Sequence, residues 1–149
     1  MRRNLFEQHK FKSAVILLLM TAFLFACNKQ KEEIEVEELE IDRSCFLHLE
    51  KDKLYVIRSY EELDELLGED TLTEEDLGIC LHCFSLLMVR GQSGVVTKVS
   101  YTLIKENQYQ LNIIVKQTPA TATSDWQVAV AVPALEEEDK VRLNIDYKK

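Results

Sequence analysis

The fold of this chain is decided by residues 84–116, which read FSLLMVRGQSGVVTKVSYTLIKENQYQLNIIVK. Residues 84–90 are almost continuously apolar, a pattern typical of a strand that is buried on both faces near the middle of a sheet. After a turn at 91–94, apolar and polar residues alternate along 95–105 and again along 109–116. This alternation predicts a hairpin with one dry and one wet face.

Two rows of apolar side chains are expected to form the dry face of this hairpin. Each row follows from the two-residue period of a strand, which turns every second side chain to the same side. The rows are Val95, Val99, Tyr101 and Leu103 on the first strand, and Tyr109, Leu111, Ile113 and Val115 on the second.

Further strands are predicted on both sides of the hairpin. Residues 54–57 form a short β-rich run, and residues 126–132 form a longer one that ends at Pro133, because proline cannot donate to a strand ladder. Trp126 shares an alternating stripe with three valines, which favours a place in the core or at its rim over a sugar-binding platform. Alternation along 141–148 predicts the last strand.

The clearest predicted helix spans about residues 59–67. Ser59 and Glu62 fit a capping box, in which the hydroxyl accepts an orphan N–H and the carboxylate reaches back to the cap. Gly68 is expected to end the helix in a left-handed conformation, and a single helical turn is predicted at 73–78. The apolar face of the main helix consists of Leu63, Leu66 and Leu67.

Together these elements predict an α+β domain over residues 45–149, an antiparallel β-sheet meander with one main α-helix. The composition is 46% hydrophobic and 30% charged, which excludes a disordered chain. The formal net charge of -8 argues against nucleic acid as a partner, because a polyanion would be repelled by most of this surface.

Residues 1–26 are expected to be a secretory signal. Basic residues precede an uncharged apolar run at 13–26, which is shorter than the roughly 20 residues that a membrane-spanning helix needs. The run ends in Leu24-Phe25-Ala26-Cys27, which resembles a bacterial lipobox. Cys27 is therefore the expected lipid-bearing N-terminus of the mature chain. The alternative is an ordinary signal peptide that ends at a cysteine by chance.

Lipidation implies a domain that folds in water and is anchored to a membrane. A lipid-modified cysteine of this kind carries several acyl chains, which give stable anchoring without a spanning helix. We therefore expect a cell-envelope location at the outer membrane. Residues 28–33, NKQKEE, are similar to the export signals that send some lipoproteins of the Bacteroidota to the cell surface, and the periplasmic face is the alternative.

Residues 27–44 are expected to form an acidic tether. Seven acidic residues fall within 32–42 and repel one another, which favours an extended, solvated stalk. The spacing of Ile34 and Val36 leaves open an edge strand laid against the domain. Calcium capture is a third interpretation, although no glycine-turned loop with alternating oxygen ligands is present in the sequence.

Three cysteines of the domain, Cys45, Cys80 and Cys83, offer three interpretations. In the structural one, a disulfide joins Cys45 to one of the other two, or the thiols are small apolar residues. In the second, His48 joins them in a zinc site of three thiolates and one imidazole. In the third, the CxxC motif at 80–83 is a redox pair, similar to that of periplasmic thiol oxidants in the thioredoxin superfamily. That chemistry needs a helix N-terminus, whereas here a strand is predicted next, so the structural interpretation is preferred.

The order of the predicted elements also resembles a family. The resemblance is carried by the capped helix at 59–67, the strand and turn at 84–94, and the strand at 126–133. These resemble a set of uncharacterised small lipoproteins of the Bacteroidota and, more distantly, the C-terminal domain of the protease-complex subunit PrcB family. The resemblance covers about residues 54–145 and implies a binding role, since members of that family stabilise a partner protease at the cell surface. It implies no catalytic residues.

The resulting hypothesis is a membrane-anchored, non-enzymatic module that binds or stabilises a protein and needs no cofactor. No nucleophile elbow or phosphate loop is present in the sequence. The expected contact region is the loop at 117–125 beside the turn at 91–94, because exposed loops on a rigid sheet commonly carry recognition. Its test residues are Thr118, Thr121 and Asp125. The alternative function is a thiol-redox or zinc-binding envelope protein that uses Cys45, His48, Cys80 and Cys83.

Overall fold

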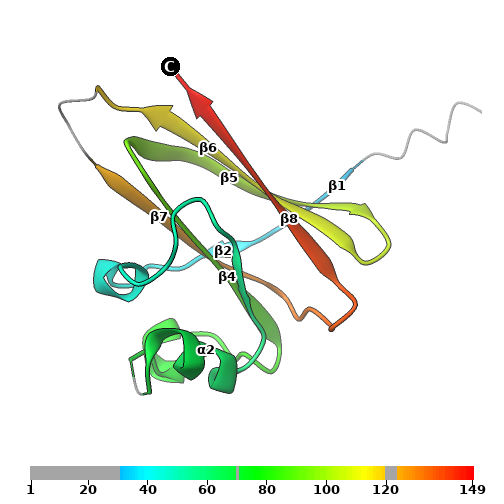
Figure 1. The fold of residues 1–149 in the computed structure, drawn as a ribbon. Coiled ribbons are helices and arrows are strands. Elements are labelled where there is room, and N and C mark those ends of the chain that lie inside the picture. Colours follow the sequence, from blue (N-terminus) through cyan, green and yellow to red (C-terminus); the bar gives the residue numbers. More distant parts are fainter. Residues whose placement is uncertain (1–30, 70, 120–123) are drawn as a thin grey trace, which may run out of the picture. The chain divides into compact units, whose positions relative to one another are not determined.

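The computed structural model describes residues 31–69, 71–119 and 124–149, and Lys31–Lys149 form one compact unit. Figure 1 shows its elements as a ribbon. Within the described residues they are, in chain order, β1 (Glu32–Ile34), β2 (Glu37–Glu38), the 3-10 helix η1 (Arg43–Phe46), β3 (Tyr55–Ile57), α2 (Tyr60–Leu67), α3 (Glu74–Leu77), β4 (Phe84–Gln92), β5 (Gly94–Lys105), β6 (Gln108–Gln117), β7 (Asp125–Pro133) and β8 (Lys140–Lys148).

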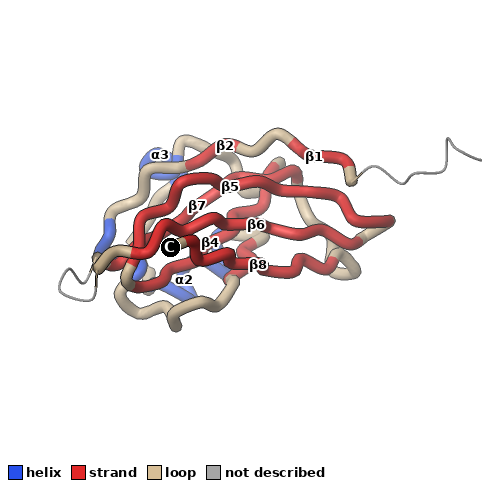
Figure 2. The backbone as a smooth tube through the Cα atoms, turned by 90° about the horizontal axis from the view of Figure 1, so that it is seen from above, coloured by secondary structure: helices blue, strands red, loops and turns tan. Residues whose placement is uncertain are grey.

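The described strands form two four-stranded sheets that pack face to face. Sheet A has the strand order β1-β5-β6-β8, and sheet B has the order β2-β7-β4-β3. Figure 2 shows β5, β6 and β8 side by side as one layer. The helices pack on the face of sheet B that is turned away from sheet A, as Figure 1 shows for α2. The predicted α+β class is thus confirmed, with mostly antiparallel strands and one main helix.

Strand β4 is buried on both of its faces, as its apolar sequence predicts. It lies inside sheet B, between β7 and β3. Leu86 and Met88 face the helices, whereas Leu87 and Val89 face sheet A, and all four are 0% exposed. Burial of such side chains contributes about 2 kcal/mol each, so this one strand supports two hydrophobic cores.

The two cores lie on opposite faces of sheet B. The helical core is made by sheet B and the helices, and the inter-sheet core lies between the two sheets. The helical core contains Ile41, Cys45, Phe46, Leu49, Ile57, Leu63, Leu72, Leu77, Ile79, Leu81, Leu86, Met88, Ala129 and Ala131. The inter-sheet core contains Leu87, Val89, Tyr101, Leu111, Ile113, Val115, Trp126, Val128, Val130, Val132 and Leu135.

Strands β5 and β6 form the predicted antiparallel hairpin, with one correction in its interior row. Tyr101 and the β6 row are in the inter-sheet core as expected. Val95, however, is 55% exposed, and its neighbour Val96 packs against that core instead. The register shifts between Val96 and Lys98, and such a bulge changes which side of the strand each earlier residue faces.

The turn at 91–94 connects two sheets and does not close a hairpin within one. Strand β4 pairs with β7 in sheet B, and β5 pairs with β6 in sheet A. Ser93 alone separates the strands and has a φ of 62°. Gly91 lies against the indole of Trp126, and a Cβ added there would be 2.1 Å from a ring atom. Trp126 itself is 5% exposed, which confirms its prediction as a core or rim residue.

The last strand is parallel to its neighbour, which the alternating pattern alone does not specify. β8 pairs with β6 along residues 140–148 in parallel register. The chain leaves sheet A after β6, forms β7 in sheet B, and then returns to sheet A. The predicted meander is therefore divided between two sheets.

The segment 32–42 is not the solvated stalk that its charge favours. β1 pairs with β5 and β2 pairs with β7, so the segment crosses from an edge of sheet A to an edge of sheet B. Ile34 and Val36 pack against the inter-sheet core, whereas Glu35 between them and the other glutamates of the segment are exposed. The acidic residues do not prevent pairing because all the glutamates of the segment stay exposed to water at the edges of the sheets. The structure has the alternative arrangement, in which the segment is laid against the domain as the edge strands β1 and β2.

The opposite side of the two sheets is formed by β3 and β8. Leu54 and Val56 pack against the same inter-sheet core as the apolar row of β8. The Tyr147 hydroxyl donates to Asp52 Oδ1 at 2.7 Å, which joins the end of β8 to the segment before β3. Burial, followed by this hydrogen bond, raises the pKa of Tyr147 to about 12.

Replacing Val96 by alanine should destabilise the protein by about 1 kcal/mol, because methyl groups are withdrawn from the inter-sheet core. Val95→Ala is the matched control, since it makes the same chemical change one residue away on an exposed side chain. Its effect should stay within about 0.5 kcal/mol. Urea unfolding of the two variants measures the difference. Equal losses would contradict the observed position of the bulge.

Tyr147→Phe should flatten the alkaline loss of stability. The pKa of the folded phenol lies above that of the unfolded one, so its contribution is complete below about pH 10 and is lost as the pH rises toward 12. The phenylalanine variant cannot ionise there. The unfolding midpoint, measured from pH 9 to 12, should therefore fall less steeply in the variant, and parallel curves would contradict the raised pKa.

Candidate functional site

The cysteine and histidine candidates occupy different environments. Cys45 lies in η1, within the helical core, and burial raises the pKa of its thiol. Cys80 and Cys83 flank a turn that leads directly into β4, and Cys83 is exposed. His82, between them, meets the ring of Tyr60 edge-on, with 6.3 Å between centroids. The CxxC motif thus precedes a strand, as predicted, and lacks the helix N-terminus that thiol oxidants use.

The structure does not bring the predicted zinc ligands together. Among the residues it describes, no three histidine, cysteine, aspartate or glutamate side chains are grouped so that they can hold a metal ion. Cys45 is buried, whereas His48, three residues later, is exposed. Cys45, Cys80 and Cys83 are all free thiols, so the expected disulfide from Cys45 to Cys80 or Cys83 is not formed in the structure.

The predicted contact loop at 117–125 is fixed at both ends. Thr118 and Asp125 lie within the described residues, and Thr121 lies outside them. The Thr118 N–H donates to the Ser93 carbonyl at 3.2 Å. At the other end of the loop, the Ser124 hydroxyl donates to the Gly94 carbonyl at 3.3 Å. The ends of the loop are therefore neighbours of the β4–β5 connection, as expected from the sequence.

A groove that the sequence does not predict runs along β3. This strand is the last one of sheet B, so no strand of the described chain pairs with its outer edge. The groove has a volume of about 340 Å³ and is open to solvent. Its walls are β3 and α2, which contribute Tyr55, Val56, Ile57, Glu62, Glu65 and Leu66.

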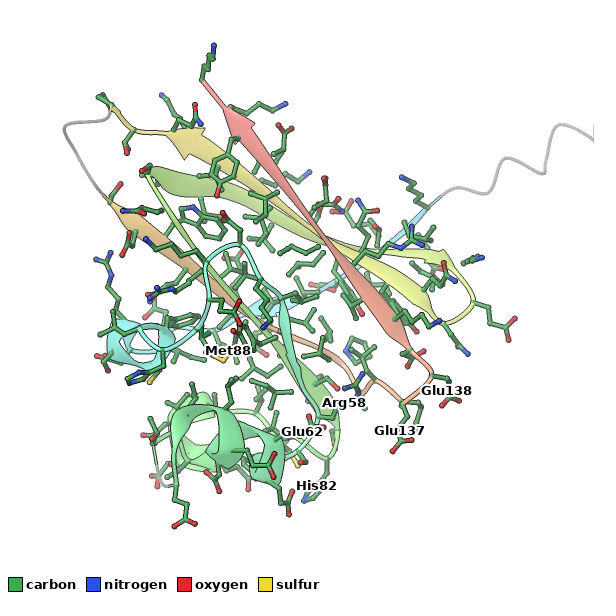
Figure 3. The ribbon with its side chains drawn as sticks, viewed as in Figure 1. Arg58, Glu62, His82, Met88, Glu137 and Glu138 are labelled. Carbon is green, nitrogen blue, oxygen red and sulfur yellow. The ribbon has the colours of Figure 1, made fainter. Side chains whose placement is uncertain are left out.

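Helix α2 is held beside β3 by its N-terminal cap. Ser59 Oγ accepts a hydrogen bond from the Glu62 N–H at 3.2 Å, as predicted. The Glu62 carboxylate does not reach back to the cap, however. It accepts from the Arg58 N–H at 2.6 Å and so joins the helix to the end of β3, where Figure 3 shows the two residues together. Gly68 also differs from expectation, since its φ of 98° is combined with an extended ψ of 148°.

The two faces of α2 separate apolar from acidic side chains. Leu63 is buried, and Leu66 and Leu67 pack against the helical core as predicted. The opposite face carries Glu61, Asp64 and Glu65, which line a second depression together with Glu69 just after the helix, and Glu65 also borders the groove along β3. The sequence from 59 to 89 has nine acidic residues and no lysine or arginine. The groove along β3 is therefore bordered by an acidic layer, which we define as α2, α3 and the rest of the segment 59–89.

Sequence reasoning missed the groove because strand periodicity does not reveal which strand ends a sheet. The run 54–57 was recognisable as a strand, but its outer edge becomes visible only once the order of sheet B is known. One signal was available, namely the absence of basic residues over 59–89 beside that strand. It indicates a surface of one charge but does not place it.

Comparison of the chain with protein-family models, with curated proteins and with solved structures found no match. Across the described residues, no helix combines the length and apolar character needed to cross a membrane. The predicted signal and Cys27 lie outside the described residues.

The three thiols should react with iodoacetamide in the order of their exposure. Cys83 should be alkylated first, whereas Cys45 should react only after unfolding, because it is buried and its raised pKa lowers the reactive thiolate fraction. Mass spectrometry of the intact mature chain counts the adducts and also reports the acyl mass expected on Cys27. Protection of two cysteines that ends on adding reductant would instead demonstrate a disulfide.

Proposed function

We propose that this protein is a membrane-anchored, non-enzymatic module of the cell envelope that holds an extended segment of a partner protein. The proposal rests on the free outer edge of β3 inside an acidic groove. An unpaired strand edge offers backbone donors and acceptors to an additional strand, and many peptide-binding domains use such an edge. The anchored location is supported by the lipobox-like sequence that ends at Cys27.

The lining of the groove defines the chemistry of the partner segment. Glu62 and Glu65 contribute carboxylates on the α2 side, and Val56, which packs against the inter-sheet core, contributes apolar surface on the other side. A strand presents alternate side chains to opposite sides. The complementary ligand is therefore an extended segment with lysine or arginine at one set of alternate positions and apolar residues at the other. The negative charge of the 59–89 segment attracts such a ligand from a distance.

The short length of β3 limits what backbone pairing alone can contribute. β3 has three residues, so an added strand forms only a few ladder hydrogen bonds, each of which contributes about 1 kcal/mol net. Most discrimination between partners then comes from the side chains of the groove. Backbone pairing along β3 and side-chain selection in the groove are together sufficient to bind a partner segment, and neither requires a catalytic residue.

Glu65→Lys should weaken partner capture at least tenfold, because it reverses an exposed charge in the groove wall. Glu75→Lys is the matched control: it makes the same change on α3, in the same acidic layer, but outside the groove. The full-length variants, expressed in the native cell envelope, are pulled down and the captured protein is quantified. A photo-crosslinker at residue 65 then identifies the segment that it contacts.

The contact loop predicted from the sequence is the competing location. Alanine replacement of Thr118, Thr121 and Asp125 should leave capture unchanged if the groove is the site. Loss of capture in this triple variant, with Glu65→Lys behaving like the native chain, would move the site to the loop. Capture that neither change affects would contradict both locations.

A further inference from the structure

The edge strand β8 is the longest unpaired sheet edge of the described chain. It has nine residues and ends sheet A, where its pairing with β6 occupies one side only. Figure 2 shows it at the margin of the sheet, on the opposite side from β1, where the described chain begins. Long open edges are rare in monomeric proteins because they template pairing with another chain.

The inner row of β8 is incompletely covered. The corresponding residues of β6, namely Leu111, Ile113 and Val115, are 0% exposed. On β8 the whole inner row remains half-buried, although it packs against the same core. A further strand beside β8 would complete this burial. The inner row of β8 consists of Val141, Leu143, Ile145 and Tyr147.

The outer row of β8 is complementary to itself. Arg142 and Asp146 lie two residues on either side of Asn144, on the face turned away from the core, where Arg142 is exposed and the Asp146 side chain is 45% exposed. If two copies of β8 pair antiparallel about Asn144, then each Arg142 lies opposite an Asp146 and the two Asn144 amides face each other. On the inner face, Leu143 then lies opposite Ile145, and Val141 opposite Tyr147. Directly opposed pairs of these kinds stabilise sheets by about 0.2–1 kcal/mol each.

We propose that two copies of this protein pair through β8, so that two A sheets join into one eight-stranded sheet with a two-fold axis at Asn144. This inference is independent of the groove along β3, which belongs to sheet B. The backbone fits this register as well. Even-numbered residues of one copy lie opposite even-numbered residues of the other, and odd-numbered opposite odd-numbered. The outward N–H and C=O groups of the two copies therefore face each other.

Other registers are less favourable. Centring the pair on Leu143 or Ile145 shortens the ladder from nine residues to about seven. Centring on Ile145 also places Arg142 opposite Lys148. The Asn144 register places Lys140 opposite Lys148, but only at the two ends. Lys148 there already pairs with Asp146 of its own strand, at 2.6 Å.

Charge reversal tests the proposed pairing. Arg142→Glu and Asp146→Lys should each raise the dimer Kd about ten- to a hundredfold, because each creates two like-charge contacts across the axis. An equimolar mixture of the two variants should dimerise again, since both contacts in the mixed pair are attractive. The double variant should also recover. Lys98→Glu, on exposed β5 two strands away, is the control and should leave the Kd unchanged.

Native mass spectrometry of the full chain in detergent measures the dimer and distinguishes mixed from identical pairs by mass. Circular dichroism verifies that each variant is folded. The concentration series descends in 100-fold steps from about 0.1 mM. A native chain that is monomeric even at the highest concentration would overturn the proposal. So would a dimer that both single variants retain, or a mixture that does not recover. Partner capture by Glu65→Lys is unaffected by either result, so the two proposals fail separately.

Discussion

The structure depends on the burial of β4 on both faces. Because successive side chains of a strand point to opposite sides, this strand forms a wall of the helical core and a wall of the inter-sheet core at once. A slip of one residue would exchange the two sets of side chains and misfit both cores. The pairing of β4 with β7 along its whole length fixes the register, and the remaining elements are positioned from this pair.

The closeness of the two sheets follows from the same strand. β4 passes to β5 through Ser93 alone, so one sheet continues into the other with almost no connecting chain. Gly91 permits this because its missing side chain leaves room for the Trp126 indole. On the far side, β3 and β8 receive no such connection. Both candidate binding edges thus lie where no segment joins one edge strand directly to the other, since β3 and β8 are far apart in the chain.

Local patterns in the sequence predict the individual strands and helices well. Which strands pair with each other depends instead on distant parts of the chain. The strand at 84–90, the capped helix and the β5–β6 hairpin follow from periodicity and capping residues alone. The bulge at Val96 reverses one assignment that strict alternation makes, and the parallel pairing of β8 depends on a crossover through the other sheet. Strand order is likewise a long-range property, so the groove beside Glu65 does not follow from local sequence patterns. The acidic segment 32–42 departs from the prediction of a solvated stalk because its glutamates stay exposed while its backbone pairs with β5 and β7.

The crossing of residues 32–42 between the two sheets gives the protein a mechanical property. If the chain is anchored through Cys27 as proposed, any load between the membrane and a bound partner enters the folded unit at β1. β1 and β2 are held by three and two residue pairs, far fewer than the central strands, so they detach first. Their release would free residues 32–38, about 23 Å of extended chain, while β4 and β7 stay paired. The exposed glutamates would keep the freed chain extended. The segment would therefore extend under load before the core strands separate.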